Sequence, residues 1–320
     1  MRRFLFFLGV LVFSWASLAQ AKTYVVSVNQ FVEHPALDAV LKGFQDYLKE
    51  NKFQIKYYIH NAQGNMATAN QIAQQIVGEH PDLILAIATP SAQACAQAIK
   101  KSPQLQDTPL LFTAITDPIG AGLVRDLKKP GKNITGVSDL LPIDQHLKMV
   151  KTFYPDLKAL GIIYNPGEAN SKTLVRLIRK QAAKMKIQLQ EAIATKSSEV
   201  YQAAQSLVGR VDAIYIPTDN TVISSFESVV KVCEQNKIPL FAGDVDSVAR
   251  GAVAALGFDY YQHGRQTGAM AKRIFLGEKP GDMPVETQKK LKLAINLKAA
   301  KAMHVTVPEK LLQQADKIYR

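Results

Sequence analysis

Cysteine is rare in this chain of 320 residues, which contains only Cys95 and Cys233. Each of the two lies within a helical pattern, and they belong to different halves of the sequence. Small exported proteins that depend on disulfides carry a denser set of cysteines. The sequence therefore provides no disulfide framework, and we interpret both cysteines as small core residues.

Motifs for catalysis and cofactor binding are also missing. The sequence contains neither the G-x-S-x-G elbow of hydrolases nor the G-x-x-x-x-G-K-[ST] phosphate loop. The nearest approach to a dinucleotide fingerprint is Gly120-Ala121-Gly122, but Arg125 occupies the position of the third glycine. The histidines are too widely spaced for a metal site. We therefore expect neither a metal nor a cofactor.

A long apolar run occurs at the N-terminus. Arg2 and Arg3 precede an apolar stretch (residues 4–18) that ends in the small-residue pattern Ala-Gln-Ala. This order predicts a cleavable signal peptide over residues 1–21. The alternative is a membrane anchor, but a spanning helix needs roughly 18 or more apolar residues. No cysteine follows the cleavage site, so a lipoprotein is not predicted, and we expect a protein of the periplasm.

The formal net charge of +12 raises the question of a nucleic-acid partner. The basic residues are scattered along helix faces, as in KTLVRLIRKQAAKMK (172–186), and no aromatic residues are interleaved with them. A nucleic-acid site normally gathers its positive charge on one face. We therefore expect a solvated surface and no nucleic-acid partner.

Apolar, β-branched runs alternate with helical patterns along the whole chain from Lys22. The length favours two lobes over a single core. The runs are almost continuously apolar, as in parallel sheets buried on both faces. We predict an α/β fold of two doubly wound, Rossmann-like parallel-sheet lobes joined by a multi-strand hinge. The predicted strands are 23–29, 53–60, 83–89, 109–116, 159–165, 187–194, 213–217, 239–243 and 253–258.

A Gly- and Pro-rich connection, KKPGKNITGVSD, divides the chain near Gly136. We assign residues 22–136 to lobe one and residues 137–258 to lobe two. A later helical segment, at about 259–290, has the right size to return to lobe one, and residues 291–320 would cross again to lobe two. Three crossings would form a hinge between the lobes.

The ends of the predicted strands carry many Asn, Ser, Thr and Asp residues, as in AIYIPTDNT (213–221). In open α/β sheets, ligands bind beyond the carboxyl ends of the strands, near helix N-termini. The same residue types also cap helices, so the evidence is their recurrence in both lobes. The predicted ligand-binding residues are Asn29, Phe31, His34, Thr89, Ser91, Thr116, Asp117, Asn170, Ser171, Thr218, Asp219, Asn220, Asp244 and Phe258.

Charge suggests roles for some of these residues toward a small zwitterionic or polyhydroxyl ligand. Hydroxyls and N–H groups at helix starts suit a carboxylate, which points to Ser91 and to Ser171 with Asn170. An ammonium group needs an anion, and Asp219 or Asp244 would supply it. The alternative for Asp219 is a helix cap or an Asx turn.

Three rings border the same strand ends. Phe31 and Phe258 would stack on a flat ligand, with burial in the core as the alternative. His34 precedes Pro35 at a helix start, where it would either contact the ligand or only close the end of the helix.

Six stretches spread over nearly the whole chain from Lys22 carry a resemblance. They are FVEHPALDAVLKGF (31–44), TAITDPIGAGLV (113–124), NITGVSDLLPIDQHL (133–147), IIYNPGEANS (162–171), IYIPTDNTV (214–222) and GFDYYQHGRQTGAMAKRIFLGEKPGDMPVE (257–286). With them the chain resembles the substrate-binding protein family of ABC transporters, whose members include tryptophan- and tyrosine-binding proteins. The resemblance implies a type I periplasmic-binding-protein fold. It also implies capture of a small ligand between the lobes, with an aromatic amino acid as the leading ligand, and delivery to a membrane permease with its ATPase.

Alternatives remain at this point. A nucleoside or a sugar would suit the same fold, because a fold does not determine its ligand. A periplasmic hydrolase would use Asp117 and Glu168 as a carboxylate pair from opposing lobes. A sensor module would present the liganded lobes to a receptor. We expect a monomer in each case.

Overall fold

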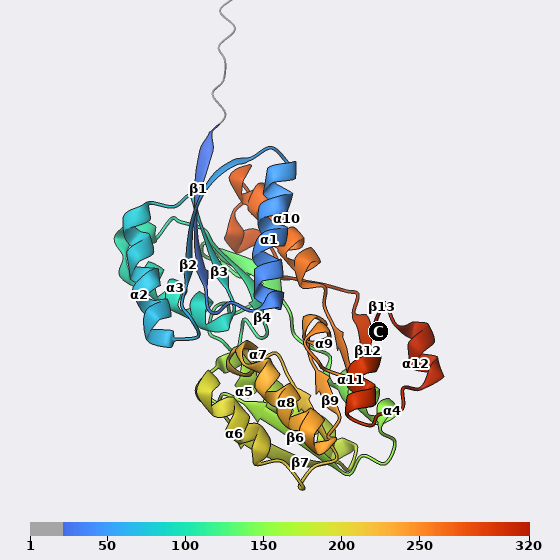
Figure 1. The fold of residues 1–320 in the computed structure, drawn as a ribbon. Coiled ribbons are helices and arrows are strands. Elements are labelled where there is room, and N and C mark those ends of the chain that lie inside the picture. Colours follow the sequence, from blue (N-terminus) through green and yellow to red (C-terminus); the bar gives the residue numbers. More distant parts are fainter. Residues whose placement is uncertain (1–21) are drawn as a thin grey trace, which may run out of the picture.

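The computed structural model describes residues 22–320, so the predicted signal peptide (1–21) lies outside the described residues. Two sheets define two lobes, which Figure 1 shows one above the other. The chain forms most of the upper lobe, lobe one, before it enters the lower lobe, lobe two. It then returns once to lobe one and ends in lobe two.

Lobe one contains six strands in the order β11-β5-β4-β3-β1-β2, and every neighbouring pair is parallel. The strands are β1 (Thr23–Gln30), β2 (Gln54–Asn61), β3 (Leu83–Ile87), β4 (Leu110–Ile115), β5 (Ile134–Ser138) and β11 (Glu286–Thr287). The helices are α1 (Pro35–Glu50), α2 (Met66–Gln75), α3 (Thr89–Lys101) and α10 (Tyr260–Phe275), with short 3₁₀ turns at Ile76–Glu79, Pro103–Leu105 and Pro280–Asp282.

Lobe two contains seven strands in the order β13-β12-β10-β9-β8-β6-β7, and only the β10–β12 pair is antiparallel. The strands are β6 (Ala159–Tyr164), β7 (Gln188–Ile193), β8 (Ala213–Ile216), β9 (Leu240–Ala242), β10 (Ala254–Gly257), β12 (Lys292–Asn296) and β13 (Lys317–Tyr319). The helices are α4 (Ile143–Phe153), α5 (Ala169–Lys184), α6 (Val200–Gln205), α7 (Asn220–Ser224), α8 (Phe226–Asn236), α9 (Asp246–Ala249), α11 (Leu297–Ala302) and α12 (Glu309–Gln314), with a 3₁₀ turn at Ser197–Glu199.

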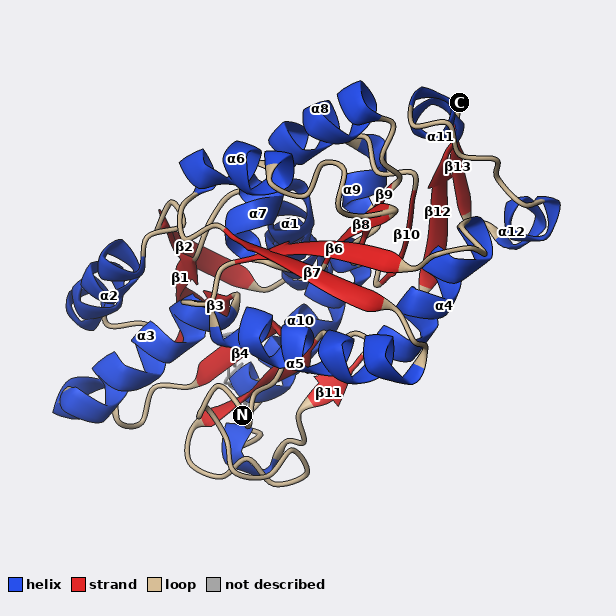
Figure 2. Ribbon diagram, turned by 90° about the horizontal axis from the view of Figure 1, so that it is seen from below, coloured by secondary structure: helices blue, strands red, loops and turns tan. Residues whose placement is uncertain are grey.

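Helices cover both faces of the lobe-two sheet. Figure 2 shows α6 and α8 on one face and α4 and α5 on the other. The central strand of this sheet, β8, is buried along its whole length, and so is β3 in lobe one, which explains their continuous apolar sequences. The predicted α/β class with two doubly wound lobes is confirmed.

All nine predicted strands occur, with ends that differ from the prediction by one or two residues. The strand β5 was missed, because its sequence ITGVS contains a glycine and follows a Gly- and Pro-rich segment. Gly136 allows this strand to pack closely on β4: a Cβ atom there would lie 2.0 Å from the Phe112 carbonyl oxygen. The boundary that we predicted near Gly136 therefore falls inside β5, and the chain leaves lobe one only after Ser138.

The chain crosses between the lobes three times, after β5, after β10 and after β11. The second crossing leads into α10, which packs on lobe one, and the third leads into β12 of lobe two. The last two crossings are tied together, because Lys292 Nζ lies 2.6 Å from Asp259 Oδ2.

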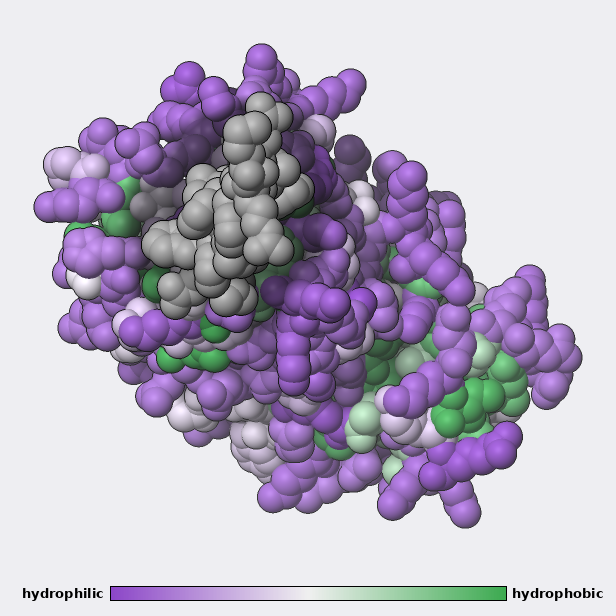
Figure 3. Space-filling model, turned by 90° about the horizontal axis from the view of Figure 1, so that it is seen from above, coloured by the Kyte–Doolittle hydropathy of each residue, from purple (hydrophilic) through white to green (hydrophobic). Residues whose placement is uncertain are grey.

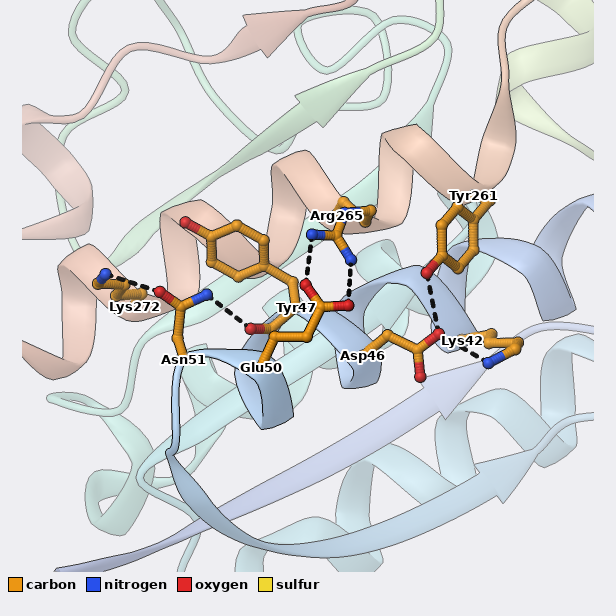
Figure 4. A network of polar contacts seen from close by, with 8 residues as sticks. All are labelled: Lys42, Asp46, Tyr47, Glu50, Asn51, Tyr261, Arg265 and Lys272. Carbon is orange, nitrogen blue, oxygen red and sulfur yellow. Dashed lines mark hydrogen bonds and ion pairs between the residues drawn. The ribbon is translucent and has the colours of Figure 1, made fainter.

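Helices α1 and α10 form the closest helix pair of lobe one. Glycines allow the contact: a Cβ on Gly264 would lie 1.9 Å from the Val40 carbonyl oxygen. Figure 4 shows the polar contacts along this pair, in which Arg265 binds Glu50 with two hydrogen bonds of 2.9 and 2.6 Å. The contacts fix the relative position of the two helices, whose N-terminal residues both face lobe two.

The outer surface is predominantly hydrophilic in the view of Figure 3. Many of its basic side chains are paired with nearby acids, for example Arg179 with Glu191 and Arg250 with Glu227. Among residues 22–320, no helix has the length and apolar character needed to cross a membrane.

Candidate functional site

The carboxyl ends of strands from both lobes meet around a narrow cavity. Its volume is only about 20 Å³, far below the several hundred Å³ of a typical ligand pocket. The side chains of the two lobes are therefore nearly in contact. The lining residues are His34, Ala36, Leu37, Ala114, Thr116, Asp139, Asn170, Thr218, Asn220, Ile223, Asp244 and Tyr260.

Three other hollows lie on the outer surface, between α1 and β2, between α2 and α3, and beside the third crossing. Within the described part of the chain, none of them is lined by a buried polar atom that lacks a partner. The interlobe cavity has such atoms, and we take it as the candidate site.

Three side chains bring these atoms to the cavity. Both ring nitrogens of His34, Oδ1 of Asn170 and Oγ1 of Thr218 are buried and have no hydrogen-bond partner among the described residues. His34 is 6% exposed and Asn170 is 3% exposed. Because buried polar atoms are nearly always hydrogen-bonded, these atoms are suited to bind a polar ligand.

Glu168 fixes the orientation of the asparagines. Its Oε2 accepts hydrogen bonds from Nδ2 of Asn220 at 2.6 Å and from Nδ2 of Asn170 at 3.2 Å. Nδ2 of Asn170 also donates to the Thr218 carbonyl oxygen at 3.0 Å. Since its donor group is occupied in this way, Asn170 presents its Oδ1 as a free acceptor.

A buried carboxylate lies at the first crossing. Asp139 follows β5 directly and is 3% exposed. Its Oδ2 accepts a hydrogen bond from Oη of Tyr260 at 2.8 Å, and its Oδ1 accepts one from Oγ1 of Thr116 at 3.3 Å. Burial raises the pKa of Asp139 despite these two donors.

Lobe two contributes a second carboxylate. Asp244 follows β9 and is 1% exposed. It accepts hydrogen bonds from N and Oγ of Ser247, at 2.8 and 2.7 Å. Burial raises the pKa of Asp244 as well. The cavity therefore combines two carboxyl groups from different parts of the fold.

The start of α1 faces the same cavity. No side chain caps this helix, and Ala36 and Leu37 of its first turn line the cavity. The N-terminal peptide groups of a helix carry partial positive charge. Burial and then the positive charge of Arg250 lower the pKa of His34 to about 3, so its ring is neutral near pH 7. A neutral imidazole offers one donor and one acceptor.

Six of the predicted residues line the cavity: His34, Thr116, Asn170, Thr218, Asn220 and Asp244. The other eight do not: Asn29, Phe31, Thr89, Ser91, Asp117, Ser171, Asp219 and Phe258. Their contacts within the protein account for most of the difference.

Asn29 and Ser91 bind each other instead of facing the cavity. Oγ of Ser91 donates to Oδ1 of Asn29 at 2.9 Å, and Nδ2 of Asn29 donates to the Ala69 carbonyl oxygen at 3.0 Å. Thr89 begins α3 with a buried Oγ1 that has no partner among the described residues, but it lies outside the cavity lining. The carboxylate-binding role that we predicted for Ser91 does not fit these contacts.

Asp219 is the N-cap of α7, which is the alternative stated above. Its Oδ1 accepts from N of Val222 at 2.9 Å, and its Oδ2 accepts from Oγ of Ser171 and from N of Asn165, both at 2.6 Å. Burial and then the negative charge of Glu168 raise the pKa of Asp219 to about 7. The predicted roles of Asp219 toward an ammonium group and of Ser171 toward a carboxylate do not fit this arrangement.

Phe31 and Phe258 are buried in the cores of lobe one and lobe two, respectively. The rings at the cavity are instead those of His34 and Tyr260. The two phenylalanines are therefore core residues, which is the alternative given in the sequence analysis.

Asp117 joins the lobes rather than lining the cavity. Its Oδ2 accepts a hydrogen bond from Oγ1 of Thr173 at 3.2 Å, and Arg176 lies 3.9 Å away. Glu168 is held by asparagine and threonine donors elsewhere in lobe two. The two carboxylates therefore have separate partners, which argues against their use as a catalytic pair.

Asp139 and Tyr260 are cavity residues that the sequence analysis missed. Asp139 follows a strand end in the same way as the selected residues, but β5 was read as a connection. Tyr260 lies within the stretch GFDYY, in which only Phe258 was selected. Recognition of GVS as a strand would have identified Asp139.

Comparisons with known proteins identify the family and the fold of the chain. A family model described as "ABC transporter substrate binding protein" matches residues 25–319. A tyrosine-binding protein of Clostridioides difficile (strain R20291) is 43% identical over 282 residues, which cover 87% of this chain and 80% of that protein. A conserved domain protein of Vibrio cholerae has a crystal structure with a TM-score of 0.89 and 44% identity, covering 93% of this chain and 100% of that one.

Two further solved structures are similar to the chain. The ABC domain from Streptococcus pneumonia in complex with L-Trp has a TM-score of 0.88 and 36% identity, and covers 93% of this chain and 100% of that one. A ligand-free, open substrate binding protein with adhesive properties from Clostridium difficile has a TM-score of 0.68 and 39% identity. The match covers 92% of this chain and 99% of that one. At similar identity, the TM-score is lower for the structure described as open than for the L-Trp complex.

Proposed function

Because the chain belongs to the ABC transporter substrate-binding protein family, we propose that it binds an aromatic amino acid in its interlobe cavity and serves an importer. The carrying observation is the composition of the cavity, which combines unpartnered polar atoms, two carboxyl groups and an apolar part. Tyrosine, tryptophan and phenylalanine match a cavity with polar and apolar parts, because each has a zwitterionic end and a flat, largely apolar end.

The apolar part of the cavity suits the ring of the ligand. Leu37 of α1 and Ile223 of α7 supply aliphatic contact from opposite lobes, and Ala36 and Ala114 leave space beside them. The ring of Tyr260 adds an aromatic neighbour. A ligand held by both lobes would stabilise the closed form, since it makes its full set of contacts only there.

The relatives support the choice of ligand. One is named a tyrosine-binding protein and another was crystallised with L-Trp, and both cover most of this chain at identities of 43% and 36%. Members of this family are binding proteins rather than enzymes, so the hydrolase alternative is rejected.

The sequence and the family support a proposal for the place of action. We propose that the predicted signal peptide directs the chain to the periplasm, where the closed, liganded form delivers the amino acid to a membrane permease with its ATPase. The family description supports this role.

Isothermal titration calorimetry on the chain from Lys22 to Arg320 tests the proposal, after unfolding and refolding to remove any bound ligand. The titrants are tyrosine, tryptophan, phenylalanine, leucine, a nucleoside and a hexose. We expect saturable binding of at least one aromatic amino acid, at least about 10-fold tighter than leucine. Binding of the nucleoside or the hexose alone would refute the amino-acid assignment and support the alternative ligands.

A further inference from the structure

The acceptor groups of the cavity are concentrated around Tyr260. The hydroxyl of Tyr260 donates to Asp139, and burial together with the negative charges of Asp139, Asp244 and Asp246 raises its pKa. Among the residues that line the cavity, Asp139 and Asp244 are the acidic ones, and no lining residue is Lys or Arg. This part of the cavity therefore favours a positively charged group over a negatively charged one.

Both carboxylates retain capacity for a further donor. Asp139 accepts one hydrogen bond on each oxygen, and so does Asp244. A carboxylate has about four acceptor positions in total. Each can therefore accept a ligand N–H without losing the protein donor that holds it in place.

An independent observation points to a donor ligand in the same cavity. Oδ1 of Asn170 is a buried acceptor without a partner, and its orientation is fixed because Nδ2 of the same residue donates to Glu168 and to the Thr218 carbonyl oxygen. An acceptor held in this way requires an N–H or O–H group from the molecule that fills the cavity.

From this arrangement we propose that Asp139 and Asp244 bind the α-ammonium group of the ligand, so that a free ammonium group is a requirement for tight binding. The inference rests on the proposed function, because it assigns one end of the amino acid that the cavity would hold. An ammonium group offers three donors, and the ion pairs form in a buried site where charge is poorly screened.

The reverse orientation is electrostatically unfavourable. A ligand carboxylate beside Asp139 and Asp244 would place like charges together in a buried site, which is strongly disfavoured. The positive end of the α1 dipole and the neutral ring of His34 provide donors for the carboxylate elsewhere in the same cavity.

The assignment replaces part of the sequence prediction. Asp244 was suggested from the sequence as a partner of the ammonium group, and Asp139 is added here. Asp219 is not assigned this role, because its carboxylate accepts hydrogen bonds from three donors of lobe two. Asp139 comes from the first crossing and Asp244 from lobe two, so one ammonium group would bridge the hinge and lobe two.

The test compares three ligands that differ by one charged group. L-Tyrosine carries both groups, tyramine lacks the carboxylate, and 3-(4-hydroxyphenyl)propionate lacks the ammonium. Each is titrated calorimetrically into the wild-type chain and into Asp139→Asn, Asp244→Asn and the control Asp144→Asn. Asp144 is an exposed carboxylate of α4 paired with Lys148, outside the cavity. Asparagine keeps the size of aspartate and can still accept from Tyr260 or Ser247.

We expect the wild type to bind 3-(4-hydroxyphenyl)propionate about 100-fold more weakly than tyrosine. Asp139→Asn and Asp244→Asn should each weaken tyrosine and tyramine by about 10- to 100-fold and leave the propionate within about threefold, whereas Asp144→Asn changes none of the three. This selective loss identifies the carboxylates as partners of the ammonium group.

Two outcomes overturn the inference while the proposed function stands. One is wild-type binding of the propionate as tight as that of tyrosine, which needs no variant and is independent of how the variants fold. The other is an equal loss for all three ligands in folded Asp139→Asn and Asp244→Asn. If the wild type binds no aromatic amino acid, both the proposed function and this inference are overturned.

Discussion

The hydroxyl of Tyr260 donates a 2.8 Å hydrogen bond to Oδ2 of Asp139 and thereby joins two of the three crossings between the lobes. Asp139 is the first residue after β5, and Tyr260 is the first residue of α10. Both line the interlobe cavity and both are nearly inaccessible to solvent. A ligand that touches this pair is therefore in direct contact with the hinge.

The first prediction concerns the hydroxyl of Tyr260. Tyr260→Phe removes a donor to a buried carboxylate and should weaken tyrosine binding by about 10-fold. The adjacent Tyr261→Phe is the matched control, because Tyr261 donates to Asp46 on α1, outside the cavity (Figure 4). Calorimetry on both variants measures the effect, and equal affinities for the two would contradict the role of Tyr260.

The second prediction concerns pH. Burial holds the pKa values of Asp139 and Asp244 above the ordinary 3.8, and the ligand ammonium binds their ionised forms. Affinity for tyrosine should therefore be full above these pKa values and fall as the pH is lowered through them. His34, with a pKa of about 3, stays neutral until the pH is lower still.

Calorimetry between pH 8 and pH 4.5, with circular dichroism to confirm folding, measures this profile. Asp139→Asn should flatten it, because one of the titrating groups is removed. An affinity that rises toward acidic pH in the wild type would be incompatible with carboxylates as the binding groups.

The third prediction concerns closure. The hydrogen bond between Thr173 and Asp117 connects the lobes directly. Thr173→Val removes it without changing the size of the side chain and should lower ligand affinity by about 3- to 10-fold, since a contact of the closed form is lost. Thr152→Val, on the exposed face of α4, serves as control. Small-angle scattering should show a larger ligand-free form for Thr173→Val than for the control.

The fourth prediction concerns the α1–α10 pair. Gly264→Ala places a Cβ against the backbone of α1 and should lower the free energy of unfolding by about 1–3 kcal/mol. It should also weaken ligand binding, because the N-terminal residues His34 and Tyr260 would shift. Gly78→Ala is the control, since a Cβ there meets nothing within 4 Å. Chemical denaturation measures the free energy of unfolding of both variants. Equal values for the two would refute the importance of this contact.

The fold was largely predictable from the sequence because buried parallel strands are continuous apolar runs. Strand β5, one of the strands that were not predicted, shows the limit of this signal: its two small polar residues and Gly136 hide a buried strand. Its close contact with β4 is a tertiary feature that a local pattern does not contain.

The candidate site was predictable as a region but not residue by residue. Strand ends selected from the sequence lie around the cavity, yet Asp219 and Asp244, which look alike in sequence, have different surroundings. Asp219 points toward donors within lobe two, whereas Asp244 reaches the cavity. The partners that separate them, Ser171 and Asn165, become neighbours of Asp219 only after folding.

The central claim is that the interlobe cavity binds an aromatic amino acid. The sequence contains a single tryptophan, Trp15, so the chain from Lys22 onward has none, and free tryptophan can be excited selectively. The most direct measurement is the emission of free L-tryptophan as the ligand-stripped chain is added, followed by competition with tyrosine. A saturable blue shift that tyrosine reverses, and that is weakened in Asp139→Asn, is the predicted result. Unchanged emission with tryptophan, together with no calorimetric binding of tyrosine or phenylalanine, would contradict the claim.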